Sequence, residues 1–350
     1  MYNHDKKIRV LVVDDSAFMR NAITKMITSD PDFVVVGTAR DGVEAIDKVI
    51  SLRPDIVTLD IEMPRMNGLE ALKVIMDKSP VPVVMLSSLT TEGARETIEA
   101  LELGALDFIP KNLSDLSINI VKIKDHLLRK LKEIGRKRFV PPKRRAREKV
   151  TVIRKSFEGQ RKVGLVAIGC STGGPRALQE IIPRLPADFP VAVLVSQHMP
   201  KSFTGPFAER LNQLSSINVK EAESGEPIKS GTVYIAPGGG HMGLLRRKAI
   251  DVRVRLLSDN GESIYKPSVD VMMLSAAEVF PGRVLGVILT GMGNDGLKGI
   301  RKIKQDGGRT IAQDEATSVV YGMPKAIVDA GLADKVLPIN EIAGEIVNSV

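Results

Sequence analysis

The chain lacks several features, and each absence removes a class of protein. Its 350 residues include a single cysteine, Cys170, which excludes an intrachain disulfide and argues against a cysteine-rich metal site. No apolar run approaches the roughly 20 residues that a membrane-spanning helix needs. The first residues carry no apolar secretory segment. We therefore expect a cytoplasmic protein without membrane insertion.

The net charge of +8 is concentrated in one segment. Residues 135–162 contain 12 Lys and Arg and two acids, a local net charge of +10, which leaves −2 for the rest of the chain. A basic run beside Pro141-Pro142 is typical of a solvated linker. DNA or lipid binding is the alternative, but no helix-turn-helix-like module follows, so we expect no nucleic-acid partner. The length suggests about two domains, and we predict them at residues 1–134 and 163–350.

The first half alternates short apolar runs with helical patterns. Such runs, rich in Val and Ile, suit strands buried on both faces, and the alternation predicts a doubly wound, five-stranded parallel α/β sheet. The predicted strands are Ile8–Val13, Phe33–Val36, Ile56–Leu59, Val81–Leu86 and Ala105–Ile109. The helical patterns begin near Phe18, Val43, Leu69, Ala94 and Leu116.

Polar residues gather where these strands end. Asp14 and Asp15 follow the first strand, Asp60 the third, Ser87 the fourth and Lys111 the fifth. Ligands bind parallel sheets at this edge, where clustered carboxylates need a compensating cation and oxygen ligands suit Mg²⁺. The alternative is that the acids are ordinary loop residues or helix caps, but five suitable groups at one sheet edge favour a site.

Residues 1 to about 125 resemble a response-regulator receiver domain. The resemblance lies in Val12-Val13-Asp14-Asp15-Ser16 and in the ten residues Leu59-Asp60-Ile61-Glu62-Met63-Pro64-Arg65-Met66-Asn67-Gly68. It implies that Asp60 accepts phosphate from a histidine kinase. It implies Mg²⁺ ligands from Asp14, Asp15, Asp60 and the main-chain carbonyl of Glu62, phosphoryl contacts from Ser87 and Lys111, and a switching aromatic at Phe108. Asn112 stands where the family normally has proline after the lysine, which bears on how Lys111 is aimed.

The second half opens with a serine on a glycine-flanked turn. The predicted strand Val163–Ile168 runs into Gly169-Cys170-Ser171-Thr172-Gly173, followed by a helical pattern with Pro175 at its first position. The Gly-x-Ser-x-Gly spacing matches a nucleophile elbow, and a helix N-terminus favours the negative charge of acyl transfer. Phosphate binding and an ordinary tight turn compete with this interpretation, although the P-loop lysine is missing. Cys170 should point back into the sheet as a small buried residue.

A serine nucleophile needs a base, and the chain has four histidines. His4 lies in the N-terminal tail and His126 on or just beyond the last helix of the first half. His198 follows the apolar run Val191–Val195, where a catalytic group could face a cleft. His241 follows Gly238-Gly239-Gly240, a flexible turn better suited to binding.

The base needs an orienting acid. Asp295 follows the predicted strand Val284–Leu289 in a glycine-rich turn, where it could instead cap the helix beginning near Leu297. Asp270 is a weaker candidate. Main-chain amides of Met292 and Thr172 are the expected oxyanion hole. The order Ser171, His198, Asp295 differs from that of α/β-hydrolases, so that fold is not inferred.

Three stretches now resemble the chemotaxis protein-glutamate methylesterase (CheB) family: Ile168–Gly174, Gln197–Pro200 and Leu289–Gly296. The resemblance covers both halves in order. It implies hydrolysis of glutamate γ-methyl esters on chemoreceptor cytoplasmic domains and, in some members, deamidation of receptor glutamines, without a cofactor at the esterase site. Ser171 is then the nucleophile, His198 the base and Asp295 the acid. Cys170 replaces the small residue that is usual there.

The family resemblance also implies that the unphosphorylated receiver covers the catalytic cleft and that phosphorylation opens it. Two other classes stay open at this point: a transcriptional regulator that uses the basic linker on DNA, and a receptor-binding adaptor with an inactive hydrolase half. The C-terminal residues Asn340–Val350 predict a short amphipathic helix.

Overall fold

The computed structural model describes residues 6–111, 116–136, 162–248, 250–258 and 265–350. Its contacts divide the chain into two compact units, Met1–Arg145 and Ala146–Val350, which are described separately. Most of the predicted linker, residues 137–161, lies outside the described residues, so the predicted domain limits stay predictions. Among the helices of the described part, none is long and apolar enough to cross a membrane.

The first unit is a five-stranded parallel sheet in the order β2-β1-β3-β4-β5. Its strands are β1 (Ile8–Val13), β2 (Phe33–Ala39), β3 (Ile56–Asp60), β4 (Val83–Ser87) and β5 (Asp107–Pro110). Its helices are α1 (Ala17–Thr28), α2 (Gly42–Leu52), α3 (Gly68–Lys78), α4 (Thr91–Leu103) and α5 (Leu116–Gly135). The doubly wound fold predicted for this half is confirmed, with boundaries shifted by at most three residues.

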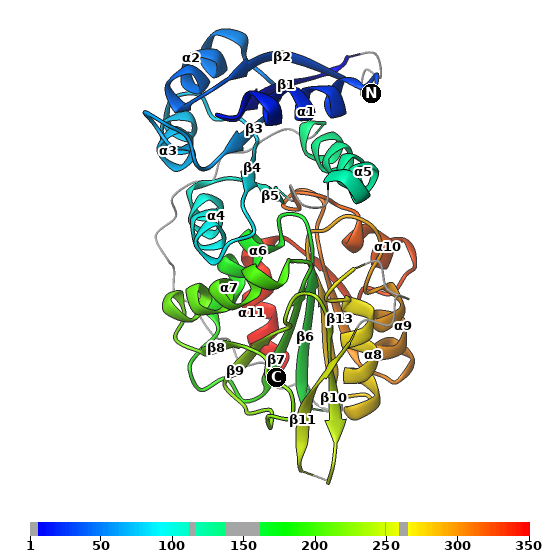
Figure 1. The fold of residues 1–350 in the computed structure, drawn as a ribbon. Helices are drawn as coiled ribbons and strands as arrows, with labels where there is room; N and C mark the ends of the chain where they lie inside the picture. The colour runs from blue at the N-terminus through cyan, green and yellow to red at the C-terminus, as the bar shows by residue number, and fades with distance from the viewer. Residues whose placement is uncertain (1–5, 112–115, 137–161, 249, 259–264) are drawn as a thin grey trace. The chain divides into compact units, whose positions relative to one another are not determined.

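Helices cover both faces of this sheet: α1 packs with α5 on one side, and α2, α3 and α4 lie together on the other (Figure 1). Residues of β3 and β4 are buried throughout, which is why their sequences are continuous apolar runs. The strand order reverses between β1 and β3, so the ligand crevice of this fold lies at the carboxyl ends of these two strands.

The second unit is a seven-stranded parallel sheet in the order β14-β13-β12-β6-β7-β9-β8, with an antiparallel hairpin β10–β11 beside it. Its strands are β6 (Leu165–Cys170), β7 (Ala192–Gln197), β8 (Asn218–Glu221), β9 (Thr232–Ile235), β10 (His241–Arg246), β11 (Val252–Leu257), β12 (Val284–Ile288), β13 (Arg309–Gln313) and β14 (Lys335–Leu337). Its helices are α6 (Gly174–Ile181), the 3-10 helix η1 (Ile182–Arg184), α7 (Lys201–Leu214), α8 (Val269–Val279), α9 (Leu297–Gln305), α10 (Met323–Asp329) and α11 (Ile339–Asn348).

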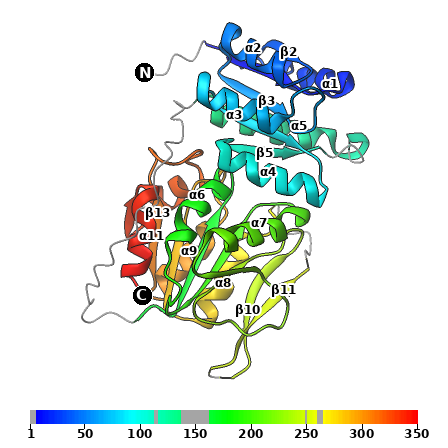
Figure 2. The same ribbon diagram turned by 90° about the vertical axis from the view of Figure 1, so that its left-hand side faces the viewer.

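This sheet also lies between two helical layers: α6, α7 and α11 on one face and α8, α9 and α10 on the other, with the hairpin packed on α8 (Figures 1 and 2). The chain leaves central β6 toward β7 and later returns to its other side at β12. The switch point of the second sheet is therefore the carboxyl end of β6. Cys170 pairs with Gln197 and Ile288 pairs with Gly169, so β7, β6 and β12 end almost level.

One local expectation is wrong. Helix α6 begins at Gly174, so Pro175 is its second residue rather than its first. His241 follows the glycine turn as expected, but it is the first residue of β10 and is 5% exposed. The paired backbone of β11 and the packing of α8 against β10 hold it in place.

Candidate functional site

Ser171 lies in a turn that the surrounding chain fixes closely. Its amide donates to the carbonyl of Thr290 (3.0 Å), and its carbonyl accepts from the amide of Gly174 (2.8 Å). Gly173 has φ +76°, a conformation that disfavours any side chain. The turn therefore takes the chain from β6 into α6 over three residues and leaves the serine half-exposed at the sheet edge.

His198 and Asp295 form a direct pair. His198 Nε2 lies 2.8 Å from Asp295 Oδ2, although 97 residues separate them in sequence. The remaining ring nitrogen, Nδ1, is buried and has no hydrogen-bond partner among the described residues. The pair needs Nε2 to carry a proton, which leaves Nδ1 as the nitrogen that can accept one.

The nucleophile and base candidates sit on neighbouring strand ends. The His198 amide donates to the Cys170 carbonyl (3.2 Å), one residue before Ser171. The buried side chain of Gln197 ties the two turns together, because its Nε2 lies 3.0 Å from the carbonyls of both Ser171 and His198. No hydrogen bond joins the Ser171 hydroxyl to His198 among the described residues; contacts of this kind often tighten only when substrate binds.

Asp295 is the most heavily hydrogen-bonded acid of the site. Besides His198, its carboxylate accepts from the hydroxyl of Ser268 (3.0 Å) and from the amides of Val269 (2.8 Å) and Asp270 (2.9 Å). These three donors form the start of α8. Burial alone would raise the pKa of Asp295, but the hydrogen bonds from His198 and from the two amides hold it below its ordinary value.

The alternative that Asp295 caps its own following helix is wrong, and so is Asp270 as the partner of the base. Asp295 accepts from the start of α8, whereas Asp270, in the first turn of α8, accepts from the Gly299 amide of α9 (2.8 Å). The two helices thus exchange caps. Burial raises the pKa of Asp270, although the backbone amides of α9 oppose this.

Four residues around the pair make contacts that the sequence did not predict. Gln197 joins the turns of Ser171 and His198, and Ser268 donates to Asp295. The Ser268 amide also donates to His241 Nδ1 (3.0 Å), so His241 helps to hold the residue that contacts Asp295. The ring of Tyr265 stacks on His198. In the sequence, only their closeness to the family-like stretches could have pointed to them. Polar and aromatic residues near a turn are common and serve many structural roles.

The expected oxyanion donors lie on the two glycine turns. A Cβ atom added at Gly291 would lie 2.9 Å from the Ser171 Cβ, so the loop after β12 passes directly over the serine. Met292 is the next residue of this loop. Thr172 follows the serine, and its carbonyl accepts from the Thr290 hydroxyl (2.9 Å). Their role as amide donors stays a prediction.

Cys170 is buried in the sheet, as expected. It is 0% exposed, and burial raises the pKa of its thiol far above the ordinary value. A thiol in this state is a poor nucleophile, because the reactive form is the thiolate.

The first unit brings together the acids predicted at its sheet edge. Carboxylate oxygens of Asp14, Asp15 and Asp60 lie within 4.8 Å of one another. Lys111 Nζ lies 2.7 Å from Asp14 and 2.6 Å from Asp60. Three carboxylates that converge with hard oxygen donors suit a divalent metal ion, and this donor set fits Mg²⁺.

Asp60 is held in an unusual state. Its side chain is almost fully buried, and burial, opposed by Lys111 but assisted by the charges of Asp14 and Asp15, raises its pKa to about 6. Burial on its own would lower the pKa of Lys111, but Asp60 and Asp14 raise it above the ordinary value. The crowded negative charge favours a cation or a proton at this site.

The other predicted receiver residues lie close by but are engaged elsewhere. The Ser87 hydroxyl accepts from the Thr97 hydroxyl (2.6 Å) and lies 3.2 Å from the Gly93 carbonyl, so it is bonded to α4. Glu62 accepts from Ser88 through its side chain (3.3 Å). Phe108 is buried, with the Lys130 ammonium 5.6 Å from its ring centre. Their roles in phosphorylation stay predictions.

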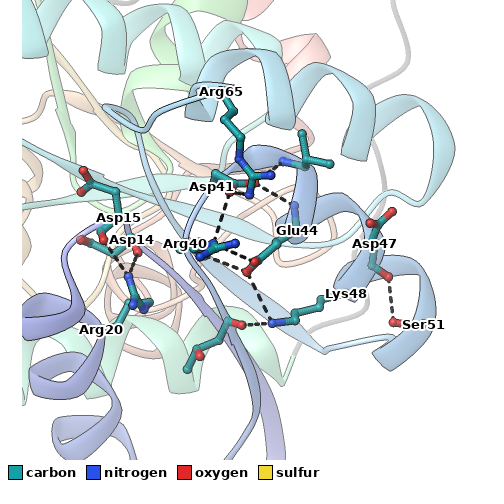
Figure 3. A network of polar contacts seen from close by, with 12 residues as sticks. Asp14, Asp15, Arg20, Arg40, Asp41, Glu44, Asp47, Lys48, Ser51 and Arg65 are labelled. Carbon is teal, nitrogen blue, oxygen red and sulfur yellow. Dashed lines mark hydrogen bonds and ion pairs between the residues drawn. The ribbon is translucent and has the colours of Figure 1, made fainter.

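A polar network beside the acids braces the adjacent loops (Figure 3). Arg20 donates to the carbonyls of Asp14 (2.7 Å) and Asp15 (2.8 Å). Asp41 caps α2 through the amides of Val43 and Glu44 and pairs with Arg65, which lies in the loop after β3 at φ 67°.

Comparison with known proteins identifies the families of the two units. Residues 10–120 match the family model of the response regulator receiver domain, and residues 166–346 match that of CheB methylesterase. The chain is 50% identical over 365 residues to a protein-glutamate methylesterase/protein-glutamine glutaminase from Nitratidesulfovibrio vulgaris, covering 98% of this chain and 99% of that one. The protein of the same name from Pyrococcus abyssi is 49% identical, covering 99% and 94%.

The second unit has a solved structural relative. The crystal structure of the Thermotoga maritima CheB methylesterase catalytic domain superposes with a TM-score of 0.52 at 46% identity, covering 54% of this chain and all of that domain. The two units therefore define a response regulator, a receiver domain joined to an α/β output domain. Within that class, the chain belongs to the CheB methylesterase family.

Proposed function

We propose that this protein hydrolyses glutamate γ-methyl esters on the cytoplasmic domains of chemoreceptors, and that phosphorylation of Asp60 controls the reaction. The observation that carries the proposal is the His198–Asp295 pair on the strand ends next to Ser171, in a chain of the CheB methylesterase family. The names of the relatives also support deamidation of protein glutamines at the same site. Such substrates place its action in the cytoplasm.

The geometry supports an acyl-transfer mechanism. His198 Nδ1 takes the hydroxyl proton as Ser171 Oγ bonds to the ester carbonyl carbon, and Asp295 stabilises the resulting imidazolium through Nε2. The C–O bond to the methoxy group then breaks, and His198 returns the proton to give methanol. Water, activated by the same nitrogen, attacks the acyl-enzyme and releases the glutamate carboxylate and free Ser171.

Charge on the carbonyl oxygen develops beside the two glycine turns. The amides of Met292 and Thr172 are the proposed donors to this oxyanion, a contribution commonly worth about 3–4 kcal/mol per donor. A glutamine side chain follows the same route, with ammonia as the leaving group. Neither route requires a cofactor at this site.

The receiver supplies the regulatory input. Asp14, Asp15, Asp60 and the main-chain carbonyl of Glu62 would hold Mg²⁺, which when bound offsets negative charge on the incoming phosphoryl group. A histidine kinase is the proposed phosphodonor. Lys111 already contacts Asp60 and is placed to pair with the phosphoryl oxygens. Ser87 would reach them after its hydroxyl leaves Thr97 and Gly93.

We propose further that the unphosphorylated receiver covers the catalytic cleft, a two-state contact that phosphorylation biases toward opening. Deleting residues 1–134 should then raise the basal rate. An unchanged or lower rate from a folded fragment would argue for another mode of control.

One assay tests the function. Methylated receptor membranes are incubated with the protein, with and without a small phosphodonor and Mg²⁺, and methanol release is measured. We expect release that rises with the phosphodonor and disappears in Ser171→Ala. Near-normal release by Ser171→Ala would refute the mechanism. No release from wild type would favour an adaptor, and tight salt-sensitive duplex binding a transcriptional regulator.

A further inference from the structure

The side chain of Tyr265 makes an unusually regular contact with the proposed base. Its ring centroid lies 4.4 Å from that of His198, and the two ring planes differ by 2°. Parallel planes with this centroid distance form an offset stack, in which the two faces partly overlap in van der Waals contact. His198 is therefore held at one edge by Asp295 and across one face by Tyr265.

The other end of Tyr265 touches the loop that carries the proposed oxyanion donor. A Cβ atom added at Gly293 would lie 2.8 Å from the Tyr265 hydroxyl oxygen and 3.7 Å from the ring carbon that bears it. Gly293 has φ +84° and directly follows Met292. Tyr265 thus spans the distance between the imidazole and the turn after β12.

Tyr265 is itself anchored to the acid of the pair. Three residues later, the Ser268 hydroxyl donates to Asp295, and the Ser268 amide donates to buried His241. The short segment from Tyr265 to Ser268 therefore contacts both the imidazole and the carboxylate, and it sets their relative orientation.

We propose that Tyr265 is a positioning residue, whose stacked ring fixes the plane of the His198 imidazole and keeps Nδ1 directed at the Ser171 turn. A single hydrogen bond at Nε2 fixes one atom of the ring but leaves rotation about the N···O line. Stacking contact on one face opposes that rotation. Pre-organisation of this kind raises the fraction of molecules in the reactive geometry.

The first test observes the ring without reference to activity. The full chain is labelled in its four histidines, and His198→Gln assigns the His198 signal in ¹H–¹³C spectra. A stacked tyrosine shifts the His198 ring protons by its ring current. We expect Tyr265→Leu to abolish this shift and Tyr265→Phe to retain it. Glu278→Ala, which truncates an exposed side chain on α8 outside the site, is the control and should leave the signal unchanged.

The second test measures methanol release, and this part alone rests on the proposed function. We expect Tyr265→Leu to lower kcat about ten-fold, with KM changed less than two-fold, and Tyr265→Phe to recover most of the loss. Ten-fold corresponds to about 1.4 kcal/mol, the size expected for an aromatic pair. A role in substrate binding would instead raise KM.

A third variant covers the case in which Tyr265→Leu does not fold. The methyl group of Gly293→Ala collides with the tyrosine hydroxyl, so this variant should lose ring-current shift and rate. Adding Tyr265→Phe removes the colliding oxygen and should restore part of both, because the next atom lies at ordinary contact distance. The backbone strain at residue 293 is the same in Gly293→Ala and in the double variant, so it cancels when these two are compared.

The outcomes are distinct. An unchanged His198 signal in Tyr265→Leu refutes the stack, and a changed signal with an unchanged kcat refutes its positioning role. No rescue of Gly293→Ala by Tyr265→Phe counts against the contact with the oxyanion loop. If wild type releases no methanol, the proposed function fails and the rate argument falls with it, while the ring-current comparison still tests the stack.

Discussion

Replacing Asp295 by asparagine should damage the reaction far more than the fold. Each oxygen of the carboxylate accepts two hydrogen bonds: Oδ2 from His198 Nε2 (2.8 Å) and the Val269 amide (2.8 Å), and Oδ1 from the Ser268 hydroxyl (3.0 Å) and the Asp270 amide (2.9 Å). Asparagine keeps one acceptor oxygen and places an NH₂ group at the other position.

Either orientation of the new amide leaves one conflict. At the Oδ1 position the NH₂ group meets the Asp270 amide, and at the Oδ2 position it meets the Val269 amide; neither backbone N–H can reverse its role. The Ser268 hydroxyl and the His198 imidazole, in contrast, can each change from donor to acceptor. One buried donor is therefore left without an acceptor, which costs about 1–3 kcal/mol of unfolding free energy.

The effect on rate is larger. With NH₂ at the Oδ2 position, His198 Nε2 must become the acceptor, so the ring proton moves to Nδ1 and that nitrogen can no longer take the proton of Ser171. With NH₂ at the other position, the tautomer survives but the negative charge that stabilises the imidazolium is lost. Comparable changes in serine hydrolases lower kcat by about 10⁴, and we expect a loss of about 10³–10⁴ in methanol release.

Asp270→Asn is the matched control, because it makes the same chemical change in the acid that caps α9. It should change the free energy of unfolding little or raise it, because burial raises the pKa of Asp270 and asparagine keeps the oxygen that accepts from Gly299, and it should change kcat less than about three-fold. Urea denaturation and initial rates of methanol release on both variants complete the experiment. Equal losses of rate in the two variants, or a wild-type rate in Asp295→Asn, would refute the assignment.

The pH dependence of stability gives a second test of Asp295. The pKa of Asp295 is lower in the folded protein than in the unfolded chain, so the unfolded chain takes up this proton first. The carboxylate stabilises the fold above about pH 4, and this contribution is lost as the pH falls through the lower, folded-state pKa. The difference in Tm between wild type and Asp295→Asn should therefore shrink below about pH 4.

Three further changes have defined outcomes. Asp60→Asn should raise the free energy of unfolding by about 2 kcal/mol at pH 7.5 without Mg²⁺, as measured by urea denaturation. The pKa of Asp60 is raised to about 6, so the buried carboxylate is ionised at pH 7.5 at a cost in free energy. This cost becomes smaller as the pH falls toward about 5. Cys170→Ala should keep the methanol-release rate within about two-fold and lose about 1 kcal/mol of stability, and the wild-type thiol should react with thiol reagents only on unfolding; rapid labelling of native protein would contradict its burial. Gln197→Met should lower kcat about ten-fold or more, because both carbonyl contacts that join the Ser171 and His198 turns are lost; an unchanged rate would mean that the strands alone hold the turns.

Much of the fold could be predicted from local pattern. The first strand was predicted at its observed bounds. The serine turn and the acidic strand ends could be recognised because they interrupt apolar runs. Each of these signals arises within about ten residues, because burial on both faces of a parallel sheet and the backbone demands of a tight turn act locally.

The contacts between residues of the site were harder to predict from the sequence. His241 was expected after a flexible turn and suited to binding, yet it is a buried strand residue that accepts a hydrogen bond from the Ser268 amide. Asp295 was a candidate cap for its own helix, yet it accepts from α8 while Asp270 accepts from α9. A carboxylate near a helix start looks the same in either case, and only the packing of α8 beside α9 decides which amides it meets.

The sequence by itself determined which chemical groups stand at strand ends: a hydroxyl, an imidazole and several carboxylates. Tertiary structure decided which of them meet. His198 reaches Asp295 across 97 residues because the chain places β7 and β12 on opposite sides of β6, and Tyr265 comes to stack on the imidazole by the same folding. Such encounters depend on the order of strands in the sheet, a long-range property that no local run of residues encodes.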